Sequence, residues 1–196
     1  MNKKYEFVEG DEITTPSGVT LKRIRALAAT AFTPAVNPGD LGGYIQSESN
    51  LSETGNAWVS GNARVFGNAQ VFGNARVFGK AQVYDNAWVS GSARVYVNAW
   101  VSGDAQVSGD AQVSDDGLIF WASKVGTDNG TLTVYNTKNN TLLVTRGCFL
   151  GSPAAFLEKS KQVHDARTHH EYKLLIEVAT SRIEAARTAL PAPEGF

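Results

Sequence analysis

The chain has 196 residues, of which 42% are hydrophobic and 19% are charged, and its formal net charge at pH 7 is −1. Eighteen Lys and Arg against nineteen Asp and Glu are not typical of a surface that coats nucleic acid. No apolar run approaches the roughly 18 to 20 residues of a membrane-spanning helix, so no membrane partner is expected. The start lacks the apolar core of a secretory signal and the single cysteine cannot form an internal disulfide, which together favour a cytoplasmic location.

Residues 1–44 are predicted to form an N-terminal β cap. Short segments with strand-like composition lie on either side of a Pro-Ser-Gly turn at residues 16–18. The end of a rod built from repeats leaves backbone groups unpaired, so a capping segment is expected before the repeat that follows.

Residues 45–120 are dominated by a repeat of six residues. Valine recurs at every sixth position from Val59 to Val113, and alanine keeps the same step two residues earlier, from Ala57 to Ala111. A period of six fits neither a helix nor a long strand, but it fits short strands joined by corners of Gly, Asn and Asp. The spacing from Leu51 to Val59 is two residues too long, which predicts one irregular corner.

This repeat resembles the hexapeptide-repeat proteins that form a left-handed parallel β-helix, in which three hexads make one coil of 18 residues. The resemblance implies a mainly β fold of about four coils, with branched aliphatic and small residues inside. It also implies a parallel homotrimer, because the chains of that family typically pack side by side. An interior filled by valine and alanine leaves no lumen for a ligand.

The rest of the chain is predicted to form a β-hairpin extension at residues 121–150 and C-terminal helices at residues 151–196. Asp-Asn-Gly at residues 128–130 and Lys-Asn-Asn at residues 138–140 are typical turns between strands. Ser152 followed by Pro153 is a typical helix start.

Segments toward both ends of the chain carry a second resemblance. Residues 23–27, 39–45 and 50–52 in the first part of the chain, and residues 131–137 and 145–151 in the last part, are similar to uncharacterised hexapeptide-repeat proteins of bacteria and their phages. This resemblance implies a phage or prophage origin, and hence the host cytosol as the location, rather than an activity.

The sequence offers little for catalysis, a metal ion or a cofactor, and we expect none of the three. Hexapeptide-repeat acyltransferases use a histidine base, and the related zinc enzymes use three histidines, but the first histidine here is His164. His164, His169 and His170 are expected to have surface or packing roles. Supply of a base from this tail would make the chain a degenerate acyltransferase, which is kept as an alternative. Cys148 is expected to be a buried small hydrophobic residue.

Reading outward positions at a step of 18 residues identifies a candidate ligand site. One face is predicted to stack Trp58, Arg76 and Arg94 in one column, beside Phe78 and Tyr96 in the next. Arginine recognises phosphate and flat rings stack on bases, so this set favours a nucleotide-type ligand.

Alternatives for these residues stay open at this stage. The arginines would equally stack on neighbouring rings or pair with Asp85 and Asp104, and the outward aromatic residues would cover a subunit interface. Arg146 belongs to a locally cationic stretch, residues 146–173, which would either help close clefts between subunits or simply form the solvated side of the helices. Extended nucleic acid is not expected, because residues 57–116 have no basic stripe.

Taken together, these observations predict a non-catalytic homotrimer that sequesters a small anionic, nucleotide-type ligand in clefts between its subunits. A signal of host antiviral immunity would be such a ligand for a phage protein. The alternative from another class is a trimeric protein-protein adaptor or inhibitor that uses its aromatic faces.

Overall fold

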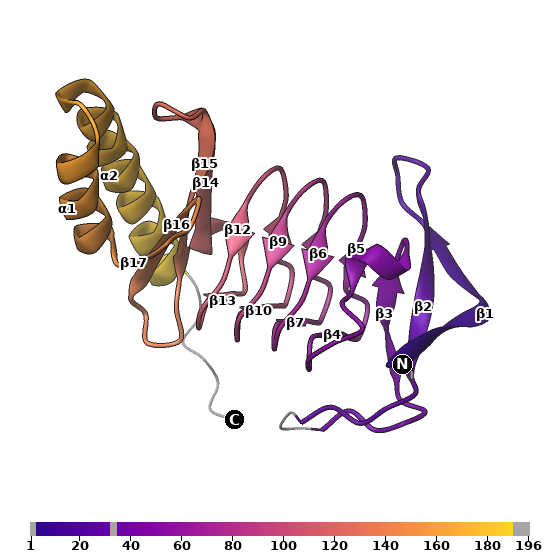
Figure 1. Ribbon diagram of the computed structural model, residues 1–196. Coiled ribbons are helices and arrows are strands. Elements are labelled where there is room, and N and C mark those ends of the chain that lie inside the picture. The colour runs from indigo at the N-terminus through magenta and orange to yellow at the C-terminus, as the bar shows by residue number, and fades with distance from the viewer. Residues whose placement is uncertain (1–2, 32–34, 190–196) are drawn as a thin grey trace.

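The computed structural model describes residues 3–31 and 35–189. The chain forms a rod-like parallel β-helix with antiparallel strands at its N-terminal end and a sheet with two helices at the other end (Figure 1). The predicted mainly β fold of about four coils with terminal additions is therefore confirmed. The last seven residues of the predicted helical tail, 190–196, lie outside the described residues.

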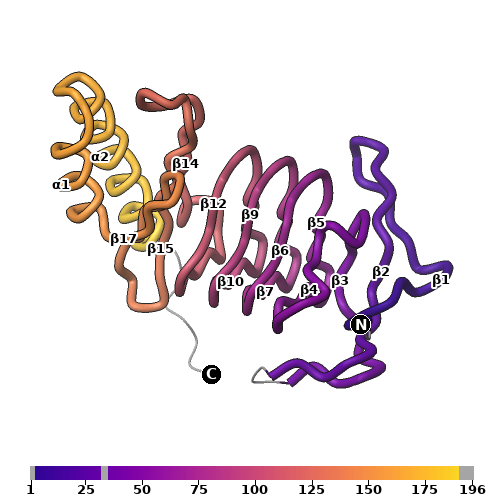
Figure 2. The backbone as a smooth tube through the Cα atoms, viewed as in Figure 1, coloured from indigo at the N-terminus to yellow at the C-terminus, as the bar shows by residue number. Residues whose placement is uncertain are grey.

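Two-residue strands joined by short corners build the coils, and Figure 2 follows the backbone through them. Each strand pairs in parallel with the strand three places further along, which lies 18 residues away in the regular part. The strands are β4 (Trp58–Val59), β5 (Arg64–Val65), β6 (Gln70–Val71), β7 (Arg76–Val77), β8 (Gln82–Val83), β9 (Trp88–Val89), β10 (Arg94–Val95), β11 (Trp100–Val101), β12 (Gln106–Val107) and β13 (Gln112–Val113).

The interior of the β-helix is filled by the two repeating residue types. Every valine from Val59 to Val113 and every alanine from Ala57 to Ala111 in the six-residue series is at most 1% exposed. Backbone hydrogen bonds join successive coils on each face, as from the Arg76 amide to the Ala93 carbonyl at 2.9 Å. Close packing of these side chains therefore makes the inside dry and places any ligand on the outside.

The corners stack as tightly as the strands do. Gly91 has a φ of 63°, and a Cβ at this position would lie 2.7 Å from the backbone nitrogen of Gly109 in the next coil. Asparagine side chains form ladders along two corners, as from Asn68 to Asn86 at 3.0 Å. Glycine is therefore required at Gly91 both for its backbone conformation and for its lack of a side chain.

The N-terminal strands continue one face of the β-helix. Strand β1 (Tyr5–Thr14) pairs with β2 (Thr20–Ala26), which pairs with β3 (Leu41–Ile45), and β3 lies parallel to β5. A single turn of 3-10 helix, η1 (Glu48–Asn50), follows β3. Ile45 pairs with a residue 20 positions away whereas β4 pairs at 18, so the extra two residues lie between Leu51 and β4. This confirms the predicted irregular corner.

The C-terminal end is larger than the predicted β-hairpin. After the short helix η2 (Asp116–Leu118), strands β14 (Ile119–Val125), β15 (Gly130–Asn136), β16 (Leu142–Arg146) and β17 (Phe149–Gly151) form an antiparallel sheet in chain order. Helices α1 (Pro153–Val163) and α2 (Ala166–Ala189) pack on this sheet. The Ser152 hydroxyl accepts a hydrogen bond from the Ala155 amide at 3.2 Å, which confirms the predicted helix start.

Lys4 fastens the N-terminal segment to the first coil. Its ammonium group donates to the Ala57 carbonyl at 3.0 Å and to the Ser52 carbonyl, while its backbone amide donates to Glu53 at 2.7 Å. The residue is 5% exposed. Burial lowers the pKa of Lys4 to about 8, although the negative charge of Glu53 opposes this shift.

This burial predicts a pH dependence of stability. The folded-state pKa of Lys4 lies below its unfolded value, so the unfolded chain binds more protons between about pH 8 and pH 10, and the free energy of unfolding rises with pH there. Lys4→Met should remove this rise, as measured by urea unfolding at several pH values.

The unfolding measurements should extend no higher than about pH 9.5. Burial raises the pKa of Tyr5 and Tyr135, so above pH 10 these tyrosines make the free energy of unfolding fall with pH. Lys159→Met, at an exposed position of α1, is the control and should keep the rise. An equal pH slope in Lys4→Met and the unmodified protein would contradict the assignment.

Candidate ligand-binding faces

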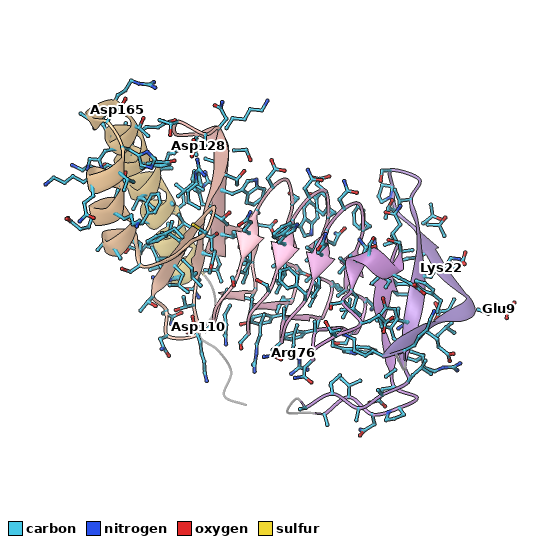
Figure 3. The ribbon with its side chains drawn as sticks, viewed as in Figure 1. Glu9, Lys22, Arg76, Asp110, Asp128 and Asp165 are labelled. Carbon is cyan, nitrogen blue, oxygen red and sulfur yellow. The ribbon has the colours of Figure 1, made fainter. Side chains whose placement is uncertain are left out.

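The first face of the β-helix consists of β4, β7, β10 and β13, and its register agrees with the predicted column. Trp58 pairs with Arg76, Arg76 with Arg94, and Arg94 with Gln112. Two arginines therefore leave the same face on successive coils, about 4.8 Å apart at the backbone. Arg76 projects outward from the β-helix in Figure 3.

The rings predicted beside these arginines also meet. Phe78 and Tyr96 stack with centroids 5.0 Å apart and an interplanar angle of 10°, and the guanidinium of half-buried Arg76 lies 5.6 Å from the Phe78 centroid. Burial lowers the pKa of Arg76, and the positive charge of Arg94 lowers it further. The structure thus brings Arg76, Arg94, Phe78 and Tyr96 together in a cationic patch beside two stacked rings.

Trp58 does not extend this patch. It is 2% exposed and belongs to the hydrophobic core, together with Tyr5 of the N-terminal strands. The expectation of an outward, ligand-accessible ring at this position was therefore wrong. The step of 18 residues assigns Trp58 to the correct column, but the added N-terminal segment covers the first coil, which the repeat alone does not reveal.

Arg146 lies in the C-terminal sheet and fastens the helices. Its Nε donates to the Tyr172 hydroxyl at 3.1 Å and its Nη2 to the Val125 carbonyl at 3.2 Å. A Cβ on Gly130 would come within 2.4 Å of its Nη1, so the guanidinium is closely packed. These contacts give Arg146 a structural role in joining β14, β16 and α2.

This role predicts a loss of stability in Arg146→Met. The buried Tyr172 hydroxyl and the Val125 carbonyl would lose their donor, and the free energy of unfolding should fall by about 1 to 3 kcal/mol, measured by urea unfolding. Arg167→Met, at an exposed position of α2, should change it little. Unchanged stability in Arg146→Met would contradict this role.

The alternative roles for the first-face arginines separate in the structure. Arg76 lies against the Phe78 ring, as the stacking alternative expected. Asp85 and Asp104 lie in the corner between the other two faces, where Asp85 accepts from the Gly103 amide at 3.1 Å and Asp104 from Asn86 at 3.0 Å. These aspartates therefore serve the corner rather than the first face.

The second face, made by β3, β5, β8 and β11, carries a groove of about 500 Å³. Its lining consists of Ile13, Tyr44, Asn62, Arg64, Lys80, Gln82, Asn98 and Trp100. The candidate site predicted from the sequence contains none of these residues. The signal was present in the repeat: Lys80 stands at a corner position that asparagine occupies one coil before and one coil after.

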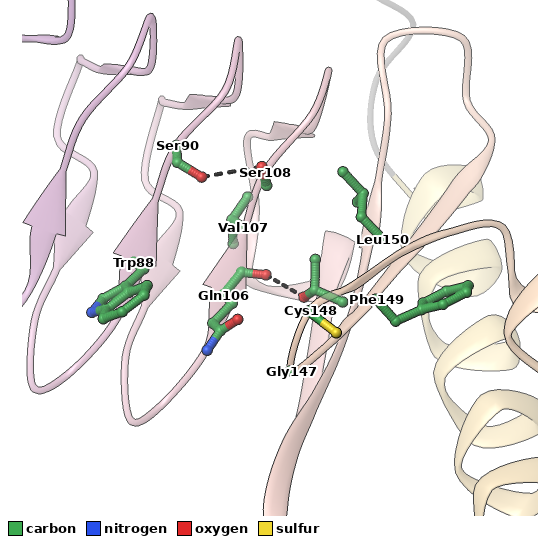
Figure 4. Close-up of a pocket in the computed structure, with 10 residues that line it drawn as sticks. Trp88, Ser90, Gln106, Val107, Ser108, Gly147, Cys148, Phe149 and Leu150 are labelled. Atoms are coloured by element: carbon green, nitrogen blue, oxygen red, sulfur yellow. Dashed lines mark hydrogen bonds between the residues drawn. The ribbon is translucent and has the colours of Figure 1, made fainter. Parts of the chain in front are cut away.

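A smaller cavity of about 150 Å³ lies where the third face, formed by β6, β9 and β12, meets β16 and β17 (Figure 4). The Ser90 hydroxyl donates to Ser108 at 3.1 Å, and Thr145 donates to the Gln106 carbonyl at 2.6 Å. Cys148 lines this cavity and is exposed, so the expected burial of its thiol was wrong. The tight turn between β16 and β17 holds it at the surface.

The histidines lie in the helical part, away from the coils. His164 packs near the Tyr172 ring at 5.5 Å, His169 lies 3.2 Å from the Ser160 hydroxyl, and His170 is exposed. Within residues 3–31 and 35–189, no three His, Cys, Asp or Glu side chains converge in a way suited to a metal ion. In the same ranges, neither helix has an apolar stretch sufficient to cross a bilayer.

Comparison with known proteins supports the repeat architecture. The family model for the YdcK beta solenoid repeat matches residues 57–71, 69–80 and 81–97. No curated protein matches the chain. The matched residues are coils of the β-helix, and the N-terminal strands, the C-terminal sheet and the helices lie outside the match. The chain thus contains a β-solenoid repeat similar to that of YdcK, with additions at both ends.

Proposed function

We propose that the protein is a non-catalytic binding protein that sequesters a small anionic, nucleotide-type ligand at the first face of its β-helix. Arg76 and Arg94 would contact phosphate oxygens, and the rings of Phe78 and Tyr96 would contact a planar base. The observation that carries this proposal is the pair of arginines on successive coils beside two stacked rings.

The electrostatics of the pair support an anionic ligand. Burial and the positive charge of Arg94 both lower the pKa of Arg76, and an anion between the two arginines would relieve the repulsion between them. Guanidinium groups bind phosphate through paired, charge-assisted hydrogen bonds. One flat face of the β-helix cannot enclose a ligand. A second copy of the chain would therefore supply the opposite wall of this site.

The aromatic surface supports association of the chain with itself. Trp88 is 44% exposed, and an exposed aromatic residue of this size favours a covered face. A homotrimer, as the resemblance to hexapeptide-repeat proteins implies, would repeat the ligand site three times. The resemblance of both end segments to phage proteins makes a nucleotide signal of host antiviral defence the ligand class that we propose.

The test is retention of nucleotides by the purified protein. The protein should be incubated with a panel of cyclic and linear nucleotides, washed, denatured, and its released ligand identified by mass spectrometry. Arg76→Ala and Arg94→Ala should each weaken binding at least about tenfold, since each removes a charge-assisted hydrogen bond. The ligand should be released chemically unchanged.

The matched control is Arg64→Ala, which removes an arginine of the second face and should leave nucleotide retention unchanged. Size-exclusion chromatography with light scattering should show the same oligomer for all variants. Chemical conversion of the nucleotide, or equal retention by the first-face variants and the unmodified protein, would contradict the proposal.

A second candidate function is that of a protein-protein adaptor, favoured by the exposed indoles of Trp88 and Trp100. An adaptor would capture a protein through these rings and would be insensitive to Arg76→Ala. Loss of capture in Trp88→Ala, with no nucleotide retained by the unmodified protein, would favour it.

A further inference from the structure

The groove on the second face runs parallel to the axis of the β-helix, across successive coils. The register places Tyr44, Arg64, Gln82 and Trp100 on four successive rungs, a length of roughly 14 Å. Ile13 of the β1–β2 hairpin also lines the groove. The groove is therefore long enough for a chain of several linked rings.

The polar side chains of this groove differ from those at the other two corners. Asn56 donates to Asn74 at 3.0 Å and Asn68 to Asn86 at 3.0 Å, so those corners satisfy their own amides. In the equivalent column of Asn62, Lys80 and Asn98, no side-chain hydrogen bond is formed within the described part of the chain. Lysine in the middle of the column interrupts the ladder and leaves the two amides without a side-chain partner among the described residues.

The strand residues of the groove have the same property. The side chains of Arg64 and Gln82 make no hydrogen bond or ion pair to any residue that the structure describes. Together with the corner column they present two cations and three amides to the same open space. These groups can donate and accept hydrogen bonds without first breaking contacts in the protein.

The charge of the groove is positive. Arg64 and Lys80 are its charged lining residues, and the lining contains no Asp or Glu. The nearest carboxylate at the Tyr44 end, that of Asp11, lies 2.7 Å from Arg23, which neutralises it. Tyr44 itself is held by hydrogen bonds from Arg23 at 2.6 Å and to Asp11 at 3.0 Å, so this end is rigid.

The far end of the groove provides a flat apolar surface. The Trp100 side chain is 48% exposed, and no ring among the described residues stacks on it. Its backbone is fixed by a hydrogen bond from its amide to Asp116 at 2.7 Å. A half-exposed indole on a fixed backbone suits the apolar face of a sugar ring as well as it suits an aromatic ring.

The donor and acceptor balance distinguishes between ligand classes. The backbone of a nucleic acid presents acceptors and one negative charge per nucleotide. It would offer no donor to the three amide carbonyls of the groove, and its charges would outnumber the two cations. Sugar hydroxyls both donate and accept, which matches amides, and a single carboxylate or sulfate along the chain matches the sparse positive charge.

We propose that the second-face groove binds an acidic oligosaccharide, with Trp100 against a sugar ring, the amides of Asn62, Gln82 and Asn98 on hydroxyl groups, and Arg64 with Lys80 on the acidic substituent. This site is separate from the first-face patch and does not depend on the function proposed there. A surface polysaccharide and a free oligosaccharide would present the same chemistry to this groove.

The test is binding of the full chain to an array of uronate-, sialate- and sulfate-bearing oligosaccharides, beside neutral oligosaccharides of equal length and a tetranucleotide of thymidine. Hits should then be titrated by isothermal calorimetry. An acidic oligosaccharide should bind at least about tenfold more tightly than its neutral counterpart, because it adds a charge-assisted hydrogen bond. Trp100→Ala and Arg64→Met should each weaken binding at least about tenfold.

Matched controls separate this site from the first face and from loss of folding. Arg76→Met should bind the oligosaccharide as the unmodified protein does, and Trp100→Ala and Arg64→Met should keep the melting temperature, since both side chains lie on the outside of the coil. A second pair, Lys80→Asn and Gln82→Ala, tests the same groove with smaller changes.

The inference would be overturned if no acidic oligosaccharide bound, if the neutral counterpart bound with equal affinity, or if the tetranucleotide bound more tightly. Binding that survives Trp100→Ala unchanged would also overturn it, because the ligand would then lie elsewhere. None of these results would bear on the nucleotide site proposed for the first face, which is tested separately.

Discussion

The packing of valine and alanine inside the coils is the constraint on which the rest of the structure depends. Each coil presents the same small set of side chains to the axis, and their burial leaves no space between them. A larger side chain inside would force the coils apart and break the backbone hydrogen bonds that join them. All chemistry of this repeat is therefore confined to side chains on its outer surface.

Regular stacking turns the outer surface into columns of residues. A step of 18 residues repeats the same position on each coil, so single differences between repeats decide the character of a face. Arg76 and Arg94 make the first face cationic next to stacked rings, while Lys80 breaks an asparagine ladder and opens the second face. Two surfaces of different chemistry thus arise on one scaffold without any change of the core.

The additions at the two ends do more than protect open edges. The N-terminal strands continue the second face and supply Ile13 and Tyr44 to its groove, and Trp58 on the first face is buried in the same core cluster as Tyr5 of these strands. The C-terminal sheet covers the last coil and, through the turn between β16 and β17, forms the cavity of the third face. End segments therefore select which parts of each column remain accessible.

The sequence by itself indicated short strands joined by corners, because a strict period of six residues fits neither a helix nor a long strand, and the resemblance to hexapeptide-repeat proteins implied the coil of 18 residues. It also determined the columns, the irregular corner after Leu51 and the helix start at Ser152. Only the tertiary structure decided which outer residues are accessible: Trp58 is covered, Cys148 is exposed, and Arg146 holds a helix. These outcomes depend on contacts between segments far apart in the chain, which a local repeat pattern does not specify.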